Sequence, residues 1–251
     1  MRYTFILILL LIISFSCKTT LELRDISNEN ISNDSSLSWV DSSIVALVLP
    51  YREALEVDMK KVLVISNEEL AKAKPESKLT NLMADYLLQS GVDYCRLARL
   101  NIVPDMAFMN YGGLRVALPR GEITVGNVFE LMPFENEMVL LKLSGPVMQQ
   151  FMQKVAARGG DGVAGIRLGI KDGHIGQLEI DGAPFDPKRD YWVVTNDYIA
   201  EGGDSMSMLL NHKESIATGI KLRDLIIERF KAEHDAGRRI KVVLDGRIYY
   251  E

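Results

Sequence analysis

Apolar residues recur at helical spacing in several segments of the chain, with short strand-like runs between them. In residues 77–91 the apolar positions share one face of a helix, and Gly91 is expected to end it. The segments 144–160 and 219–237 show the same amphipathic spacing, and 125–132 predicts a short helix. The helical spacing around Pro50 predicts a helix that is broken or restarted at the proline.

Runs rich in β-branched and aromatic residues, bounded by turn signals, predict the strands. They cover residues 62–66, 105–110, 138–144, 163–170, 175–180, 190–196 and 240–250. Helices and strands are mixed without regular alternation of strand and helix. This order predicts an α+β fold with largely antiparallel sheets packed against helices.

The N-terminus has the pattern of a secretory signal. Met1 and Arg2 precede an apolar stretch that ends in the sequence SFSC at Cys17. This ending resembles the lipobox of bacterial lipoproteins, although the usual leucine three residues before the cysteine is missing. We expect a signal peptide over 1–17, lipidation at Cys17, a polar tether over 18–38 and a folded domain over 39–251. The alternatives are an ordinary cleaved signal peptide and an uncleaved anchor.

A signal of this kind places the protein in the bacterial cell envelope, attached to a membrane by lipid and facing the periplasm or the outer surface. The formal net charge is −5, which argues against binding a nucleic-acid polymer, because such binding requires many Lys and Arg side chains. A small phosphorylated ligand needs only a few arginines. Cys95 has no partner in the mature chain and is expected to be a buried thiol.

The three histidines lie outside any metal-ligand motif, and neither a P-loop nor a G-x-S-x-G motif is present. A two-metal phosphoesterase needs several His, Asp and Asn ligands, which these histidines do not supply. We therefore expect no metal or other cofactor in this chain.

Three loops carry residues suited to ligand binding instead. NYGGLR contains Gly112 and Gly113, which allow a positive φ or a close approach to a ligand, followed by Arg115 with its planar guanidinium. A glycine turn with a solvated arginine is the alternative. MPFEN places Phe134 in a polar setting, either facing a ligand or capping a sheet edge. NDYIAEGGDS places Tyr198 at the end of a strand, either as a core residue or as a platform for a ligand.

Taken together, these loops predict a nucleotide-binding site without a catalytic centre. Phe134 and Tyr198 could stack on the two faces of a flat heterocycle. Asn136 and Asp204 could form hydrogen bonds with ring nitrogens or ribose hydroxyls, and such buried polar partners give selectivity. Arg115 could contact a phosphate.

In these same residues the chain resembles the C-terminal domain of the 5'-nucleotidase / UDP-sugar hydrolase family. The segments that carry the resemblance are NLMADYLLQSG, NYGGLR, GEITVGNVFELMPFENEMVLLKLSG and YWVVTNDYIAEGGDS, within residues 40–250. The resemblance implies that the base stacks between Phe134 and Tyr198. It also implies that Asn110 and Asn136 contact the nucleoside, that Arg115 binds phosphate or ribose, and that Asp204 binds ribose.

Two departures from the family pattern concern phosphate recognition. Tyr111 replaces one glycine of the family's N-G-G-G turn, which is expected to narrow the approach of the backbone. An arginine that many members place before the N-x-x-x-D helix has no counterpart, and only Lys72, Lys74 and Lys78 lie there. A lysine lacks the bidentate fork of arginine.

The resemblance covers the substrate-binding half of the family, whose full-length members also carry a metallophosphoesterase domain with two divalent metals. We therefore expect a nucleotide-binding chain that is inactive alone and acts with a separate catalytic chain. The alternatives are a stand-alone nucleoside- or nucleotide-binding lipoprotein used for scavenging, and a structural relic that binds no ligand.

Overall fold

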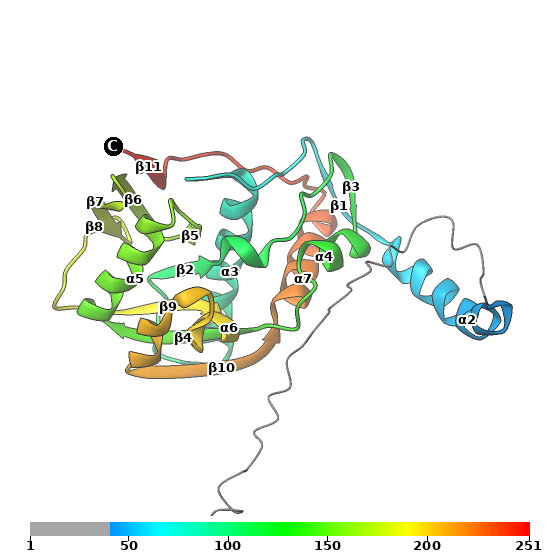
Figure 1. Ribbon diagram of the computed structural model, residues 1–251, viewed down its shortest axis with the longest axis horizontal. Helices are drawn as coiled ribbons and strands as arrows, with labels where there is room; N and C mark the ends of the chain where they lie inside the picture. The colour runs from blue at the N-terminus through cyan, green and yellow to red at the C-terminus, as the bar shows by residue number, and fades with distance from the viewer. Residues whose placement is uncertain (1–40) are drawn as a thin grey trace, which may run out of the picture. The chain divides into compact units, whose positions relative to one another are not determined.

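The centre of the structure is a five-stranded sheet with the strand order β10-β4-β9-β2-β5. It is seen in a computed structural model that describes residues 41–251 (Figure 1). The strands are β2 (Met106–Met109), β4 (Glu137–Ser144), β5 (Gly162–Ala164), β9 (Asp190–Asn196) and β10 (Glu214–Lys221). Strands β2 and β9 are parallel, and the other three pairings are antiparallel.

Two smaller sheets complete the strand structure. One pairs β1 (Val62–Ser66) with β3 (Gly121–Thr124), and the other has the order β11-β6-β7-β8. Its strands are β6 (Ile166–Lys171), β7 (His174–Ile180), β8 (Ala183–Pro184) and β11 (Ile248–Tyr250). Most of the pairings are antiparallel, which confirms the predicted α+β class.

Both faces of the central sheet are buried, each in its own hydrophobic core. Along β4, Met138 and Leu140 belong to one core, whereas Val139 and Leu141 belong to the other. The alternation follows from the two-residue period of a strand, which sends successive side chains to opposite faces. The central strands are therefore apolar almost throughout.

Helices from different parts of the chain cover these two faces. The first core packs against α3, α4 and α7, and the second against α5. In Figure 1, α5 lies toward the sheet of β6, β7 and β8, and α7 toward β1 and β3. These helices are α3 (Lys78–Leu97), α4 (Val125–Leu131), α5 (Gly145–Ala157) and α7 (Leu222–Asp235).

Two helices differ from the sequence-based prediction. Helix α2 (Ser42–Met59) continues through Pro50 instead of breaking there. The proline leaves the carbonyl of Ala46 without its helical partner, and the exposed position of Ala46 lets water satisfy that carbonyl. Helix α3 continues past Gly91 to Leu97. The glycine permits close packing inside the helix, since a Cβ atom there would lie 2.4 Å from Val194 of β9.

The strand predictions also needed three corrections. The run 163–170 is divided between β5 and β6, because Gly165, at φ +78°, approaches the carbonyl oxygen of Asp105 so closely that a Cβ atom would lie 2.4 Å from it. The run 240–250 forms a strand only over β11. Strands β3, β8 and β10 were not predicted. Strand β3 begins at a glycine with positive φ and β10 contains one, whereas β8 has only two residues.

The predictions made for the N-terminus, namely the signal peptide 1–17, lipidation at Cys17 and the tether 18–38, lie outside the described residues. Residues Val48–Glu251 form one compact unit. Within the described range 41–251, no helix is both long and apolar enough to cross a membrane. Cys95 is buried and free, as expected.

Candidate functional site

The residues singled out from the sequence meet where three strands of the central sheet end. Because β2 and β9 are parallel, Asn110 after β2 and Asn196 at the end of β9 lie at the same edge. Strand β4 is antiparallel to β9, with Met138 opposite Asn196, so Asn136 just before β4 lies there too. The topology therefore brings together three segments that are far apart in the sequence.

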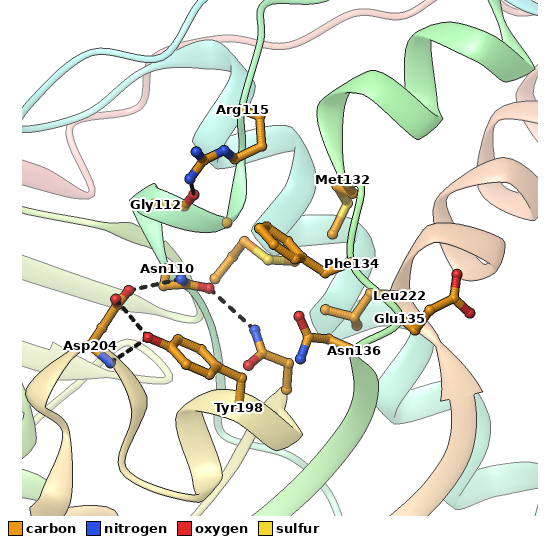
Figure 2. Close-up of a pocket in the computed structure, with 13 residues that line it drawn as sticks. Asn110, Gly112, Arg115, Met132, Phe134, Glu135, Asn136, Tyr198, Asp204 and Leu222 are labelled. Carbon is orange, nitrogen blue, oxygen red and sulfur yellow. Dashed lines mark hydrogen bonds between the residues drawn. The ribbon is translucent and has the colours of Figure 1, made fainter. Parts of the chain in front are cut away.

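A pocket of about 640 Å³ opens at this edge. Phe134 and Tyr198 enter it from two different segments, and Figure 2 shows both rings among the lining side chains. Their side chains remain 47% and 45% exposed, although burial of an aromatic ring is normally favourable. Neither residue is therefore a core aromatic. The other lining residues are Met109, Asn110, Gly112, Gly113, Arg115, Met132, Glu135, Asn136, Asn196, Asp204 and Leu222.

A chain of hydrogen bonds runs below the pocket from a backbone amide to a carboxylate. The Ile199 N–H donates to Asn196 Oδ1 over 2.9 Å, and Asn196 Nδ2 donates to Asn110 Oδ1 over 3.2 Å. Asn110 Nδ2 then donates to Asp204 Oδ2 over 2.8 Å (Figure 2). Each amide group is thereby held in one orientation.

The G-G-D segment shapes the turn that carries Asp204. Gly202 adopts φ +87°, and Asp204 itself adopts φ +52°. A Cβ atom on Gly203 would lie 2.6 Å from ring carbons of Tyr198, so only glycine leaves room for that ring. The Tyr198 hydroxyl donates to Asp204 Oδ1 over 3.2 Å and accepts the Asp204 N–H over 3.1 Å. The aromatic ring and the carboxylate are thus fixed to each other.

Arg158 stabilises the turn that carries Asp204. Its Nη1 donates to the Asp204 carbonyl over 3.1 Å, and its Nε lies 3.3 Å from Oδ2 of the buried Asp161. Asp161 Oδ1 accepts the Tyr111 N–H over 2.8 Å. Burial raises the pKa of the Asp161 carboxyl above its ordinary value, against the lowering effects of the Tyr111 amide and of Arg158. Arg158 therefore links the Asp204 turn to the glycine turn through Asp161.

We expect Arg158→Ala to lower the free energy of unfolding by about 1–3 kcal/mol near neutral pH, because it leaves the carboxylate of Asp161 buried without its cation. A raised pKa means that the protonated carboxyl favours folding below the ordinary pKa and that this contribution is lost as the pH rises through the folded pKa. Loss of Arg158 raises the pKa of Asp161 in the folded state further. The loss of stability caused by Arg158→Ala should therefore shrink in acid. Urea unfolding near pH 7 and pH 4.5 measures this. Arg158→Lys, which keeps a positive charge, is the control. If the loss of stability in Arg158→Ala did not depend on pH, the role given to Asp161 would be wrong.

The glycine turn Tyr111–Gly113 is a 3₁₀ turn, and neither of its glycines has a positive φ. Gly113 is required for a different reason, since a Cβ atom there would lie 2.8 Å from Asn110 Oδ1. Tyr111 does not line the pocket. Its ring lies beneath Lys72 and Lys74, whose Nζ atoms are 4.4 Å and 5.2 Å from the ring centroid.

Lys72 lies close to the turn that precedes Arg115. Its Nζ donates to the carbonyls of Tyr111 and Leu114 over 3.1 Å and 2.5 Å. Burial lowers the pKa of Lys72, and the charge of Arg115 lowers it further. Arg115 donates to the Gly112 carbonyl over 3.2 Å, and its guanidinium lies 5.8 Å from the centre of the Phe134 ring. Among the described residues, Arg115 forms no ion pair with a carboxylate, so its charge is available to an anion.

The loop that carries Phe134 is attached to the start of α7. Glu135 pairs with Lys221 and with the largely buried Arg223. The Leu222 N–H donates to the Asn136 carbonyl over 2.9 Å. These contacts hold the segment on both sides of Phe134 while leaving its ring in the pocket.

All eight residues proposed from the sequence as ligand contacts line this one pocket, and they are Asn110, Gly112, Gly113, Arg115, Phe134, Asn136, Tyr198 and Asp204. Sequence reasoning missed Asn196, Arg158 and Asp161. The Asn196–Asp197 pair after a buried strand is a helix-start signal that could have identified Asn196. In residues 41–251, no three His, Cys, Asp or Glu side chains are grouped as metal ligands.

Comparison with known proteins identifies the same region. Residues 58–211 match the model of the 5'-nucleotidase, C-terminal domain. The protein UshA of Escherichia coli (strain K12) is 32% identical over 120 residues, which are 46% of this chain and 22% of UshA. UshA of Yersinia enterocolitica is 25% identical over 251 residues, covering 96% of this chain and 43% of that protein.

Solved structures give the same result for the fold. The 5'-nucleotidase precursor from Thermus thermophilus superposes with a TM-score of 0.70 at 25% identity, covering 84% of this chain and 43% of that one. The chain thus spans less than half the length of these relatives. The family match extends over more than half of the chain and includes the strand ends that carry Phe134 and Tyr198. The chain therefore belongs to the 5'-nucleotidase C-terminal domain family.

Proposed function

We propose that this chain binds the base and ribose of a nucleotide and presents the phosphate to a metallophosphoesterase active site on a separate polypeptide. The observation that carries the proposal is the pair of half-exposed rings, Phe134 and Tyr198, in one pocket lined with amides and a carboxylate. A heterocycle between them would gain about 1–3 kcal/mol from each stacking contact.

The polar groups around the pocket suit the rest of a nucleotide. Asp204 is a ribose ligand in this proposal, since a carboxylate accepts hydrogen bonds from both ribose hydroxyls. Asn110 and Asn136 contact the nucleoside. Arg115 faces the phosphate, and the nearby charge of Lys72 adds to the positive potential there. The arginine that many family members place before the N-x-x-x-D helix has no counterpart here, so its bidentate contact would be missing. Phosphate should therefore add less affinity than stacking does.

The chain would contribute binding and orientation, and its partner would contribute the chemistry. Holding a substrate in the reactive position lowers the barrier of a reaction without any bond-making group in the binding half. The divalent metals of phosphate-ester hydrolysis would then belong to the partner. Attachment to the cell envelope through a lipid on Cys17 would keep the two proteins on one membrane surface.

We expect the isolated chain to release no phosphate from AMP above background, with or without added Mg²⁺, Mn²⁺ or Zn²⁺. The same preparation should bind AMP and adenosine in calorimetry. The measurement is colorimetric phosphate release, with the Phe134→Ala/Tyr198→Ala variant as the control for contaminating phosphatase. Metal-dependent hydrolysis that disappears in this variant would contradict the proposal.

The same experiments separate the two alternatives. A scavenging lipoprotein would be favoured if the chain binds a nucleoside tightly but no partner protein is found whose addition leads to hydrolysis of the nucleotide. Failure of the unmodified chain to bind any nucleoside or nucleotide would favour a structural relic.

A further inference from the structure

The amide group of Asn136 has a fixed orientation in the pocket. One of its side-chain atoms lies 2.7 Å from Asp197 Oδ1. An ionised carboxylate only accepts hydrogen bonds, so the Asn136 atom that faces it must be the Nδ2 amino group. The same Asp197 oxygen accepts the Tyr198 N–H over 2.8 Å, which holds the carboxylate in place.

This orientation leaves the carbonyl oxygen of Asn136 as an acceptor that faces away from Asp197. Asn136 lines the pocket, and Figure 2 shows its oxygen on the side nearer Phe134 and its nitrogen on the opposite side. Within residues 41–251, no hydrogen bond reaches this oxygen. The backbone of Asn136 is also held, since its carbonyl accepts the Leu222 N–H.

The other side-chain amides of the pocket are already engaged at their oxygens. Asn196 Oδ1 accepts the Ile199 N–H, and Asn110 Oδ1 accepts from Asn196. Asn136 Oδ1 is thus the amide acceptor that a ligand placed next to Phe134 can reach. A ligand edge that carries an N–H would pair with it, whereas an edge without a donor would leave it buried and unpaired.

We propose that Asp197 is a positioning residue that fixes Asn136 as a hydrogen-bond acceptor, so that the site selects heterocycles with an amino or ring N–H donor over isosteres without one. The inference rests on the proposed function and deepens it, because it assigns a base preference to the same pocket. Stacking alone would accept every heterocycle equally. Selectivity arises because the acceptor is fixed before the ligand binds.

The test compares adenosine with purine riboside, which has the same ring and sugar but lacks the 6-amino group. Calorimetry on the unmodified chain should give about a tenfold preference for adenosine. Asp197→Ala removes the oxygen that accepts from Asn136 Nδ2, so the Asn136 amide is free to turn over. The preference should then fall to about twofold or less, mainly through weaker binding of adenosine.

Two further variants complete the design. Asn136→Ala removes the acceptor and should also abolish the preference, which keeps the test decisive if Asp197→Ala does not fold. Asp235→Ala, the matched control, removes a carboxylate from the exposed end of α7 and should leave the preference unchanged.

The possible failures are distinguishable. Equal affinities of the unmodified chain for adenosine and purine riboside would overturn this inference and leave nucleoside binding intact. A preference that persists in Asp197→Ala would overturn the positioning role of Asp197. If neither compound binds, the proposed function fails as well.

Discussion

Replacing Phe134 and Tyr198 together by alanine should reduce the affinity for adenosine by about two orders of magnitude or more. Each ring is expected to contribute about 1–3 kcal/mol through stacking, and 1.4 kcal/mol corresponds to a factor of ten. The free energy of unfolding should change little, because both side chains are nearly half exposed and neither belongs to a core. Tyr198→Ala should reduce the affinity for adenosine more than Phe134→Ala does, because it also releases Asp204 from the Tyr198 hydroxyl.

Calorimetry with adenosine and AMP measures the effect, and circular dichroism checks that the variants fold. Tyr51→Ala is the matched control: this ring is 76% exposed and belongs to α2, outside the pocket. Wild-type affinity in the double variant would mean that the two rings do not hold a base.

Gly203→Ala should have the second large effect, although position 203 need not touch a ligand. The added methyl group would lie 2.5 Å from the Tyr198 carbonyl oxygen and 2.6 Å from its ring carbons, so the ring or the turn must move. We expect adenosine affinity to fall more than tenfold and the free energy of unfolding to fall by about 1–3 kcal/mol, the usual cost of overpacking.

Gly112→Ala is the matched control for stability, because its methyl group would come no closer than 3.7 Å to Asp204 Oδ2, an ordinary contact. With no positive φ to preserve, alanine there should leave the free energy of unfolding unchanged or raise it slightly. Equal effects of the two substitutions in chemical denaturation would show that crowding at Tyr198 is not the cause.

The contact residues of the pocket could be predicted from the sequence because each lies in a short motif at the end of a strand. Phe134 stands between a proline and polar residues, and Tyr198 follows a buried strand, so local context alone marked both rings as unusual. The second layer could not be predicted this way. Arg158 and Asp161 reach Asp204 and Tyr111 across 46 and 50 residues of sequence, and only the folded chain reveals such partners.

Glycine caused most of the errors in predicting the fold. A glycine at position 91 is typical of a helix end, yet Gly91 lies inside α3 and allows the helix to approach Val194 of β9. Gly165 looks like part of one strand, yet it separates two strands that belong to different sheets. A pattern of apolar residues cannot distinguish a glycine that breaks an element from one that permits close packing, because the neighbour it contacts is distant in sequence.

Every donor in the hydrogen-bond chain that ends at Asp204 points in the same direction, away from the backbone amide of Ile199. If Asn196 became aspartate, two oxygens would face each other at Asn110. If Asn110 then turned over, the conflict would move to Asp204. A single exchange of amide for carboxylate therefore displaces the mismatch along the chain without removing it. Substitutions along this series of hydrogen bonds should be tolerated only in compensating pairs. This includes Asn196, whose amide is separated from the pocket by the amide of Asn110.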